Sequence, residues 1–250
     1  MLNSNINILV TGSKGFIGKN LLKKLDSNYL EFNRDDSLET LEKQIIQSDF
    51  IVHLAGEVRP NSSNDDFKNS NTLLTQNIVD VLRKHSKHIP ILMASTIHAK
   101  LLKNEYGKTK REAEILVENY SKETNAKCFI YRLPHVFGEG CKPNYNSVIS
   151  TWIYNSIHNL EINCFDRNIQ MYYVYVQDIV DDFVSIIDNQ TLEETYIEPK
   201  KVFETTLGEV LDFIDEFKHN IQSQDYQPNS SEFKQKLYET YLDYYRTSNV

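Results

Sequence analysis

The chain has 250 residues, of which 40% are hydrophobic, so it can bury one substantial core, as one large domain or a domain with a small lobe. Its net charge of -8 argues against nucleic-acid and anionic-membrane partners, because both select for basic surfaces. No apolar run approaches the roughly 20 residues of a transmembrane helix, and the start lacks the basic region of a signal peptide. Three cysteines without zinc-binding spacing fit a reducing compartment. We therefore expect a cytoplasmic protein without a bound metal.

The first 135 residues alternate short β-branched runs with longer amphipathic segments, which is typical of βαβ units and a parallel sheet. Strands are predicted at Ile6–Thr11, Tyr29–Asn33, Phe50–Leu54, Ile89–Ser95 and Lys127–Arg132. Helices are predicted at Gly15–Leu25, Leu38–Gln47, Asn69–His85 and Tyr106–Glu123. The predicted fold class is α/β, with a Rossmann-type doubly wound parallel sheet.

The rest of the chain begins with turn-forming residues after Arg132, which indicate a long loop where open α/β sheets bind ligands. Later predictions are a helix over Ser147–His158, a strand over Met171–Val176, a helix from Asp178, a capping box at Thr206–Glu209 and a terminal helix containing Tyr238, Tyr241, Leu242 and Tyr245. We expect one unit over residues 1–250. About residues 1–135 would form its dinucleotide-binding core, and about residues 136–250 a small, mainly substrate-binding lobe.

Three glycines lie between the first strand and the first helix, where a dinucleotide fingerprint requires them. Glycines let the backbone turn tightly and approach a pyrophosphate, which the amide groups of the helix then bind. Small residues at the end of the third strand would let a dinucleotide lie against bare backbone. The predicted cofactor-binding residues of these two segments are Gly12, Lys14, Gly15, Phe16, Ile17, Gly18, Leu54, Ala55 and Gly56.

The second strand ends in Phe32-Asn33-Arg34, where many dinucleotide folds place an acidic residue that binds the ribose 2′-hydroxyl. An arginine there suits a 2′-phosphate, so Arg34 favours NADPH over NAD. The alternative is a solvated Arg34 that pairs with Asp35 or Asp36.

Tyr106 and Lys110 are four residues apart in a predicted helix, so both side chains can reach one ligand. A phenol has a pKa near ~10, and a nearby cation lowers it, so the pair predicts an acid/base for hydride chemistry. A hydroxyl at the end of the fourth strand would hydrogen-bond the substrate oxygen. We favour Thr96 over Ser95 for this role; the alternative is that both cap a turn. His53 is predicted to be a packed histidine.

With these residues in place, the chain resembles the extended short-chain dehydrogenase/reductases, which include nucleotide-sugar epimerases, dehydratases and reductases. The matching motifs are Gly12-x-x-Gly15-Phe16-x-Gly18, His53-Leu54-Ala55-Gly56, Ser95-Thr96, Tyr106-x-x-x-Lys110, Arg132 to Gly138 and Val174 to Asp178. The resemblance implies a triad in which Tyr106 exchanges a proton with the sugar oxygen, Lys110 binds the nicotinamide ribose and lowers the Tyr106 pKa, and Thr96 orients the oxygen. It also implies a homodimer formed by the helices that contain Asn71 and Tyr106.

A closer similarity is to the reductase half of CapF-type capsular-polysaccharide enzymes, which act on the route to UDP-N-acetyl-L-fucosamine. It is carried by Ala55-Gly56 with Arg59-Pro60, Cys141 to Ile149, Asp166-Arg167-Asn168 and the region from Tyr238 to Tyr241. It implies NADPH-dependent reduction of the 4-keto group of a UDP-2-acetamido-2,6-dideoxyhexos-4-ulose. The substrate-binding candidates are Arg59, His135, Lys142, Asn146 and Arg167.

Four departures from related enzymes bear on function. The chain has no paired-histidine cupin signature, so we expect reduction alone, with a separate cupin-type epimerase as a candidate partner. His135 replaces the usual asparagine, and Met171 the usual arginine, for which Arg167 would substitute. Ile97-His98 stands where 4,6-dehydratases have Asp-Glu, which disfavours dehydration. An NAD-dependent 4-epimerase and a non-catalytic cofactor-binding scaffold remain alternatives.

Overall fold

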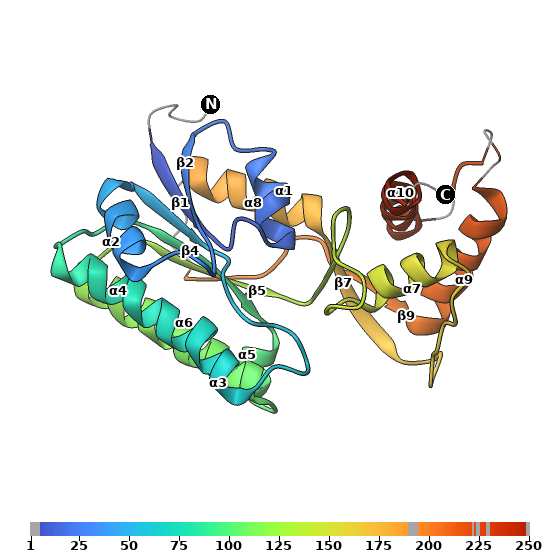
Figure 1. Cartoon of the computed structure of the whole chain (residues 1–250), viewed down its shortest axis with the longest axis horizontal. Coiled ribbons are helices and arrows are strands. Elements are labelled where there is room, and N and C mark those ends of the chain that lie inside the picture. Colours follow the sequence, from blue (N-terminus) through green and yellow to red (C-terminus); the bar gives the residue numbers. More distant parts are fainter. Residues whose placement is uncertain (1–5, 190–194, 222, 224–225, 229–230, 249–250) are drawn as a thin grey trace. The chain divides into compact units, whose positions relative to one another are not determined.

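The computed structural model describes residues 6–189, 195–221, 223, 226–228 and 231–248 (Figure 1). It divides into two compact units. The first comprises Met1–Leu133 and Val180–Pro199, and the second comprises Pro134–Ile179 and Lys200–Val250. The chain therefore leaves the first unit after Leu133, returns to it at Val180 and leaves it again after Pro199, whereas the expected substrate lobe comprised everything from about residue 136.

A six-stranded parallel sheet forms the centre of the first unit, in the order β2-β1-β3-β4-β5-β8. The strands are β1 (Asn7–Thr11), β2 (Asn28–Phe32), β3 (Phe50–His53), β4 (Ile91–Thr96), β5 (Cys128–Leu133) and β8 (Tyr196–Ile197). The predicted Rossmann-type sheet is confirmed. Because β2 and β3 lie on opposite sides of β1, the strand order reverses there, which is where such sheets bind ligands.

Helices cover both faces of this sheet. They are α1 (Phe16–Leu22), α2 (Leu38–Gln47), α3 (Asn64–Phe67), the π-helix η1 (Lys68–Leu73), α4 (Leu74–Lys84), α5 (His98–Leu101), α6 (Glu105–Thr124) and α8 (Val176–Asp188). On one face, α2, α4 and α6 pack on strand residues such as Leu9, Ile51 and Met93. On the other face lie α1 and α8 (Figure 1). The helix predicted at Asn69–His85 is in fact η1 followed by α4.

The second unit has a smaller sheet in the order β6-β7-β9 and an aromatic core. Its elements are β6 (His135–Phe137), α7 (Val148–Ile157), β7 (Gln170–Tyr175), β9 (Phe203–Thr206), α9 (Leu207–Asn220) and α10 (Glu232–Thr247). The predicted terminal helix is confirmed as α10, whose tyrosines pack against α9; Tyr241 lies 5.8 Å from Phe217 between ring centroids. Only half of the predicted capping box forms. Thr206 caps the Glu209 amide, but the Glu209 carboxylate accepts from Thr205 instead.

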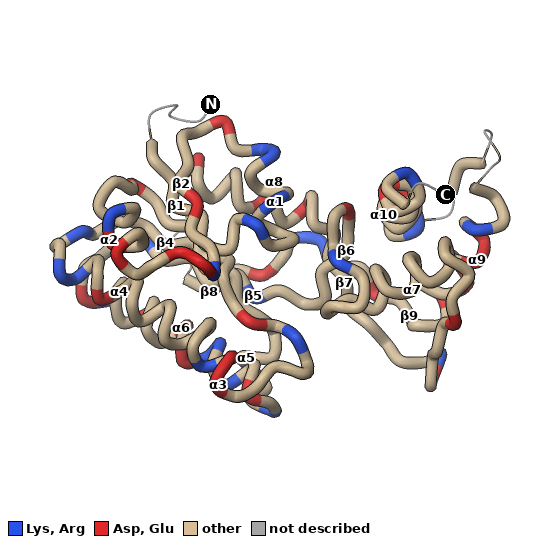
Figure 2. The backbone as a smooth tube through the Cα atoms, in the orientation of Figure 1, with Lys and Arg blue, Asp and Glu red and all other residues tan. Residues whose placement is uncertain are grey.

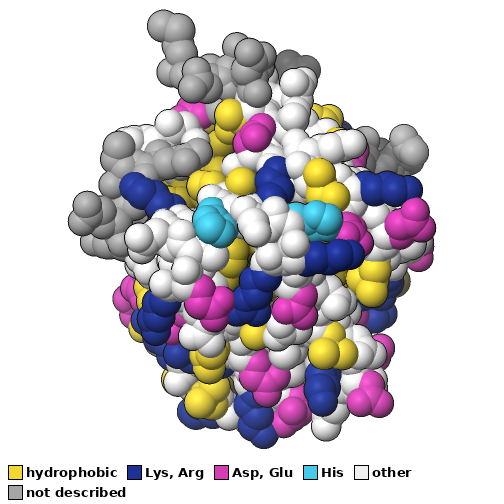
Figure 3. All heavy atoms as spheres, turned by 90° about the vertical axis from the view of Figure 1, so that its left-hand side faces the viewer, with side chains coloured by type: hydrophobic (Ala, Val, Ile, Leu, Met, Phe, Trp, Pro, Cys, Tyr) yellow, Lys and Arg dark blue, Asp and Glu magenta, His cyan; other side chains and the backbone are white. Residues whose placement is uncertain are grey.

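The described helices include none that is long and apolar enough to cross a membrane. Both signs of charge occur along α2, α4 and α6 (Figure 2). The face shown in Figure 3 likewise mixes acidic, basic and hydrophobic side chains without a block of one sign.

Candidate active site

Glycines in and after the loop between β1 and α1 let its backbone pack closely against neighbouring backbone atoms. Gly12 has φ +72°, and a Cβ added there would lie 2.7 Å from the Ala55 nitrogen. A Cβ at Gly18 would lie 2.4 Å from the Gly12 oxygen, so these positions require glycine. Gly15 precedes α1 and provides no side-chain cap for its first amide groups. Such a loop fits the diphosphate of a dinucleotide, which backbone N–H groups would hold.

The end of β2 is tied to this loop by Asn33, which occupies the position of the usual acidic residue. Its Oδ1 accepts from the Lys14 amide at 3.0 Å, and its Nδ2 lies 2.9 Å from Ser13 Oγ. Ser13 also donates to Glu31 Oε2 at 2.7 Å. The strand end therefore fixes the glycine loop through side chains, and the next residue, Arg34, has a side chain that is 65% exposed.

Arg34 does not pair with Asp35 or Asp36, as the alternative interpretation supposed, but with Glu57. Its Nη2 donates to Glu57 Oε2 at 2.9 Å. Arg59 donates to the same carboxylate through Nη2 at 2.7 Å and through Nε at 2.9 Å. Burial disfavours the charge of Glu57, yet hydrogen bonds from Arg59 and Arg34 lower its pKa to about 2. Glu57 was not among the predicted site residues, although it directly follows the Ala55-Gly56 strand end.

The π-helix η1 brings Asn71 to the same strand end. Asn71 Oδ1 accepts from the Glu57 amide at 2.9 Å, and its Nδ2 donates to Thr109 Oγ1 at 3.2 Å. A Cβ added at Gly56 would lie 2.7 Å from Asn71 Oδ1 and 3.9 Å from Lys110 Nζ. The segment after β3 therefore adjoins helix α6, which carries the predicted acid/base pair.

Helix α6 places Tyr106 in its first turn. Asn104 caps the helix by accepting from the Gly107 amide at 2.8 Å, and the close approach of Gly107 to the His98 carbonyl leaves no room for a Cβ. The Tyr106 ring lies 6.0 Å from that of Phe67 and 6.1 Å from that of His98, between ring centroids. Capping and packing together fix the phenol.

The pKa of Tyr106 is raised in this structure, so the lowering expected from Lys110 does not outweigh the effect of burial. Burial raises the pKa of Tyr106 to about 12, and the hydrogen bond with Thr96 opposes this only in part. The Lys110 Nζ donates to the Ala94 carbonyl on β4 at 2.6 Å. Burial also lowers the pKa of Lys110 to about 8, against the attraction of Glu114. The phenol therefore stays protonated at neutral pH and can serve as a proton donor.

The two hydroxyls at the end of β4 have different partners. Ser95 Oγ donates to Glu114 Oε1 at 2.6 Å. Glu114 is buried and also accepts from Arg132 at 2.6 Å and from Arg111 at 2.9 Å. Alternation along the strand points Ser95 to this cluster and leaves Thr96 beside Tyr106. The arrangement supports Thr96 as the substrate-facing hydroxyl.

His53 lies at the end of β3 as a packed residue. Its Nδ1 is 2.7 Å from Thr11 Oγ1 and its Nε2 is 2.9 Å from Thr75 Oγ1. Burial, together with Lys110, lowers its pKa to about 3, so the ring is neutral at pH 7. Ala55 donates its amide to Thr11 Oγ1 at 3.2 Å, which completes a network beneath the glycine loop.

The remaining substrate-binding candidates belong to the second unit. His135 is on β6, with its ring 5.9 Å from that of Tyr173. Lys142 Nζ lies 5.8 Å from the centroid of the Tyr145 ring, and Asn146 follows in the same loop. Arg167 donates to Asp212 Oδ1 at 2.6 Å and to the Gly208 carbonyl at 3.2 Å. Arg167 is therefore an ion-paired residue of its own unit.

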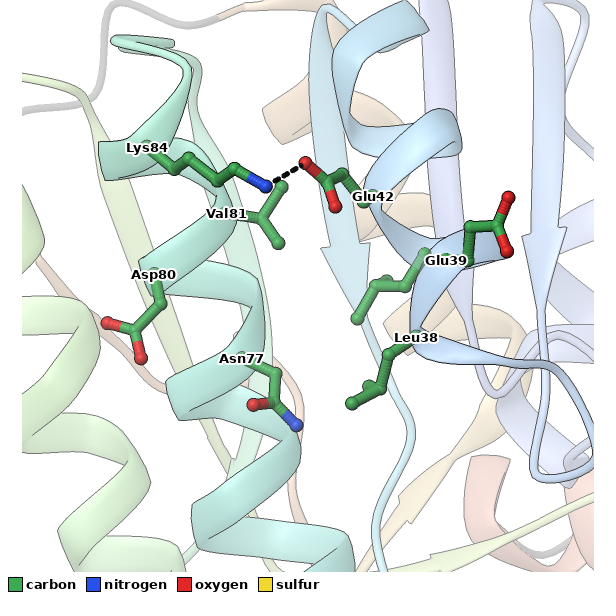
Figure 4. A pocket seen from close by; sticks show the side chains of 8 residues that line it. Leu38, Glu39, Glu42, Asn77, Asp80, Val81 and Lys84 are labelled. Atoms are coloured by element: carbon green, nitrogen blue, oxygen red, sulfur yellow. Dashed lines mark hydrogen bonds and ion pairs between the residues drawn. The ribbon is translucent and has the colours of Figure 1, made fainter.

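A hollow of about 320 Å³ lies between α2 and α4 (Figure 4). Leu38 and Glu42 line it from α2, and Val81 and Lys84 from α4. Lys84 and Glu42 form an ion pair of 2.7 Å across it. None of the candidate site residues lines this hollow.

The first unit thus combines a glycine loop of the kind that binds dinucleotides with the predicted pair Tyr106 and Lys110, in a Rossmann-type fold. The chain belongs to the NAD dependent epimerase/dehydratase family, whose model matches residues 8–197. The other comparisons agree with this class.

Two relatives are similar over nearly the whole chain. The UDP-2-acetamido-2,6-beta-L-arabino-hexul-4-ose reductase of Pseudomonas aeruginosa is 32% identical over 241 residues, which are 95% of this chain and 64% of that protein. The crystal structure of the capsular polysaccharide assembling protein CapF from Staphylococcus aureus is 37% identical, with a TM-score of 0.86, over 98% of this chain and 67% of that one. The chain spans less than two thirds of the Pseudomonas reductase.

A more distant structure shares the fold. WbmF of Bordetella bronchiseptica, solved in complex with NAD+, is 16% identical with a TM-score of 0.78, over 98% of this chain and 94% of that one.

Proposed function

We propose that this protein is a cytoplasmic nucleotide-sugar reductase that uses NADPH to reduce the 4-keto group of a UDP-2-acetamido-2,6-dideoxyhexos-4-ulose. The product class would be that of the UDP-N-acetyl-L-fucosamine route. The observation that carries the proposal is the convergence of Tyr106, Thr96 and Lys110 at the end of β4. Similarity to the Pseudomonas reductase supplies the substrate class.

The chain's own residues would handle the proton. Bound NADPH would supply the hydride to the sugar C4. Tyr106, held protonated by a pKa of about 12, would donate its proton to the oxygen on which negative charge develops. Thr96 would hydrogen-bond that oxygen. Lys110 would bind the ribose next to the reacting ring, and its charge would favour the transient phenolate.

NADPH is favoured over NADH by the charge at the end of β2. Arg34 and Arg59 share one carboxylate, that of Glu57, so this cluster has two guanidinium groups for one carboxylate. A guanidinium is well suited to a phosphate dianion. Three residues of the second unit remain proposed substrate contacts: His135, Lys142 and Asn146. Because Arg59 pairs with the same carboxylate as Arg34, we now propose that it contacts the cofactor and not the substrate.

The test is to purify the protein, measure bound nicotinamide cofactor and follow NADPH oxidation with a panel of UDP-4-keto-6-deoxy-HexNAc sugars. We expect loss of one NADPH for each sugar reduced. Stoichiometrically bound NAD with no net NADPH consumption would replace the proposal with a 4-epimerase. Cofactor binding without turnover on any sugar of the panel would favour a scaffold. Size measurement in the same experiment tests the proposed homodimer.

A further inference from the structure

We propose that Glu57 is a specificity-determining positioning residue that holds Arg34 and Arg59 as a clamp for the adenosine 2′-phosphate. This inference rests on the proposed use of NADPH. Arg34 follows β2 and Glu57 follows β3, while the glycine loop follows β1 between them. The cluster therefore lies where the ribose of a dinucleotide meets the end of the second strand.

The Glu57 carboxylate is fixed from several sides. Its Oε1 accepts from the amides of Val58 at 3.0 Å and Arg59 at 2.9 Å, and also from the Arg59 Nε. Its Oε2 accepts from Arg34 and from Arg59 Nη2. The backbone of Glu57 is held in turn by Asn71. An anchor with so many contacts has one orientation, and both guanidinium groups follow it.

The exposure of the arginines separates this cluster from a purely structural one. The Glu57 side chain is 0% exposed, but the side chains of Arg34 and Arg59 are 65% and 41% exposed. A planar guanidinium has five N–H groups, so bonding to Glu57 uses only part of the Arg34 capacity. The exposed part can bind an anion while the buried glutamate keeps the side chain ordered.

A carboxylate beside a phosphate site has two opposed effects. Its charge repels the phosphate, whereas its hydrogen bonds hold the arginines in place before the ligand arrives. Ordering a long side chain only upon binding weakens affinity. Because two guanidinium groups exceed one carboxylate in charge, we infer that the positioning effect dominates.

Glu57→Gln distinguishes these effects, because glutamine keeps the shape but presents donors to the arginines. Calorimetry would compare 2′,5′-ADP with 5′-AMP, and NADPH with NADH. We expect Glu57→Gln to raise the dissociation constants of 2′,5′-ADP and NADPH by about tenfold. Those of 5′-AMP and NADH should change by less than about twofold. The matched control is Glu114→Gln, because Glu114 is also a buried carboxylate that binds two arginines. This substitution should leave unchanged the affinity of 2′,5′-ADP relative to 5′-AMP and that of NADPH relative to NADH.

A double-mutant cycle tests whether Glu57 acts through Arg34. In an Arg34→Ala background, Glu57→Gln should weaken NADPH by clearly less than tenfold, because the positioned group is gone. Glu57→Asp keeps the charge on a shorter side chain, and provides a second variant if Glu57→Gln does not fold. We expect it to weaken 2′,5′-ADP more than 5′-AMP.

Unchanged or tighter NADPH binding in Glu57→Gln would overturn the inference and make Glu57 a charge-neutralising residue. Equal weakening of NADPH and NADH would also overturn it, because a general structural role predicts that result. The wild-type protein separates this failure from that of the proposed function. If the wild type does not prefer NADPH to NADH, the proposed cofactor is wrong; if it does and Glu57→Gln retains the preference, only the role of Glu57 is wrong.

Discussion

Two buried glutamates, Glu57 and Glu114, each hold a pair of arginines near the carboxyl ends of strands. Glu57 follows β3, and Glu114 contacts the ends of β4 and β5. Each has a side chain that is 0% exposed, and each binds two arginines. The arginines of Glu57 are 65% and 41% exposed, whereas Arg111 and Arg132, the arginines of Glu114, are 31% and 12% exposed. The arginines bound to Glu57 therefore expose their charge to solvent beside the proposed cofactor site. Those bound to Glu114 are more buried, near the proposed reaction site.

The difference follows from what each glutamate joins. Glu57 connects two loops, so its arginines extend from loop segments toward solvent. Glu114 connects helix α6 to the ends of β4 and β5 through Ser95 and Arg132, which are parts of the core. Exposure therefore distinguishes an arginine cluster proposed for ligand binding from one that joins helix α6 to the strands. Four predictions test this contrast.

The largest effect is expected at the reaction end, in Tyr106→Phe. Loss of the proton donor should lower turnover by about 10²–10⁴-fold, while NADPH binding remains within about threefold. Tyr120→Phe is the matched control on the same helix, since the Tyr120 hydroxyl donates to the Ile89 carbonyl away from the site. Steady-state kinetics and cofactor titration provide the measurements. Near wild-type turnover in Tyr106→Phe would remove Tyr106 from the mechanism.

Glu114→Ala should destabilise the fold, because it leaves Arg132 as a largely buried charge without its partner. We expect a loss of about 3–5 kcal/mol in the free energy of unfolding, measured in urea. Glu112→Ala, two residues away on the exposed side of α6, should change it by about 0.5 kcal/mol or less. Equal effects of the two substitutions would contradict the structural role of Glu114.

Arg34→Ala should change cofactor selectivity rather than stability. Loss of a charge-assisted contact to the 2′-phosphate should weaken NADPH by about tenfold or more and leave NADH nearly unchanged. Arg83→Ala is a suitable control, because Arg83 on α4 pairs with Glu123 on α6 and is not one of the candidate site residues. An unchanged ratio of the two dissociation constants in Arg34→Ala would argue against a 2′-phosphate site.

The smallest effect is a pH dependence from Lys110. Its pKa is lowered to about 8, so it loses its charge as the pH rises through that value, whereas Tyr106 stays protonated until about 12. We expect kcat/KM to fall by about tenfold between pH 7 and pH 9. Lys110→Arg, which stays charged, should lower activity but remove this fall. A fall that persists in the arginine variant would assign it to another group.

The sequence predicted the features that local patterns determine. The five main strands lie within two residues of their expected bounds, since β-branched runs between glycine turns are strong signals. The glycine loop and the spacing of Tyr106 and Lys110 were equally visible. Strands β6, β8 and β9 were missed because two to four residues carry too little alternation.

Other features depend on contacts between distant segments. The Arg34–Glu57 pair joins residues 23 apart, and nothing local distinguishes Glu57 from Asp35 or Asp36 as a partner. The π-helix has no periodicity of its own within six residues. The pKa of Tyr106 depends on burial, which spacing to Lys110 does not reveal.

Isotope transfer tests the central claim most directly. The wild-type protein would be given NADPH deuterated at the transferable position and a UDP-2-acetamido-2,6-dideoxyhexos-4-ulose, and the sugar would be analysed by NMR and mass spectrometry. The proposed reaction places one deuterium on C4 of the product for each NADPH oxidised. A product with unlabelled C4, or a sugar converted without NADPH oxidation, would contradict it.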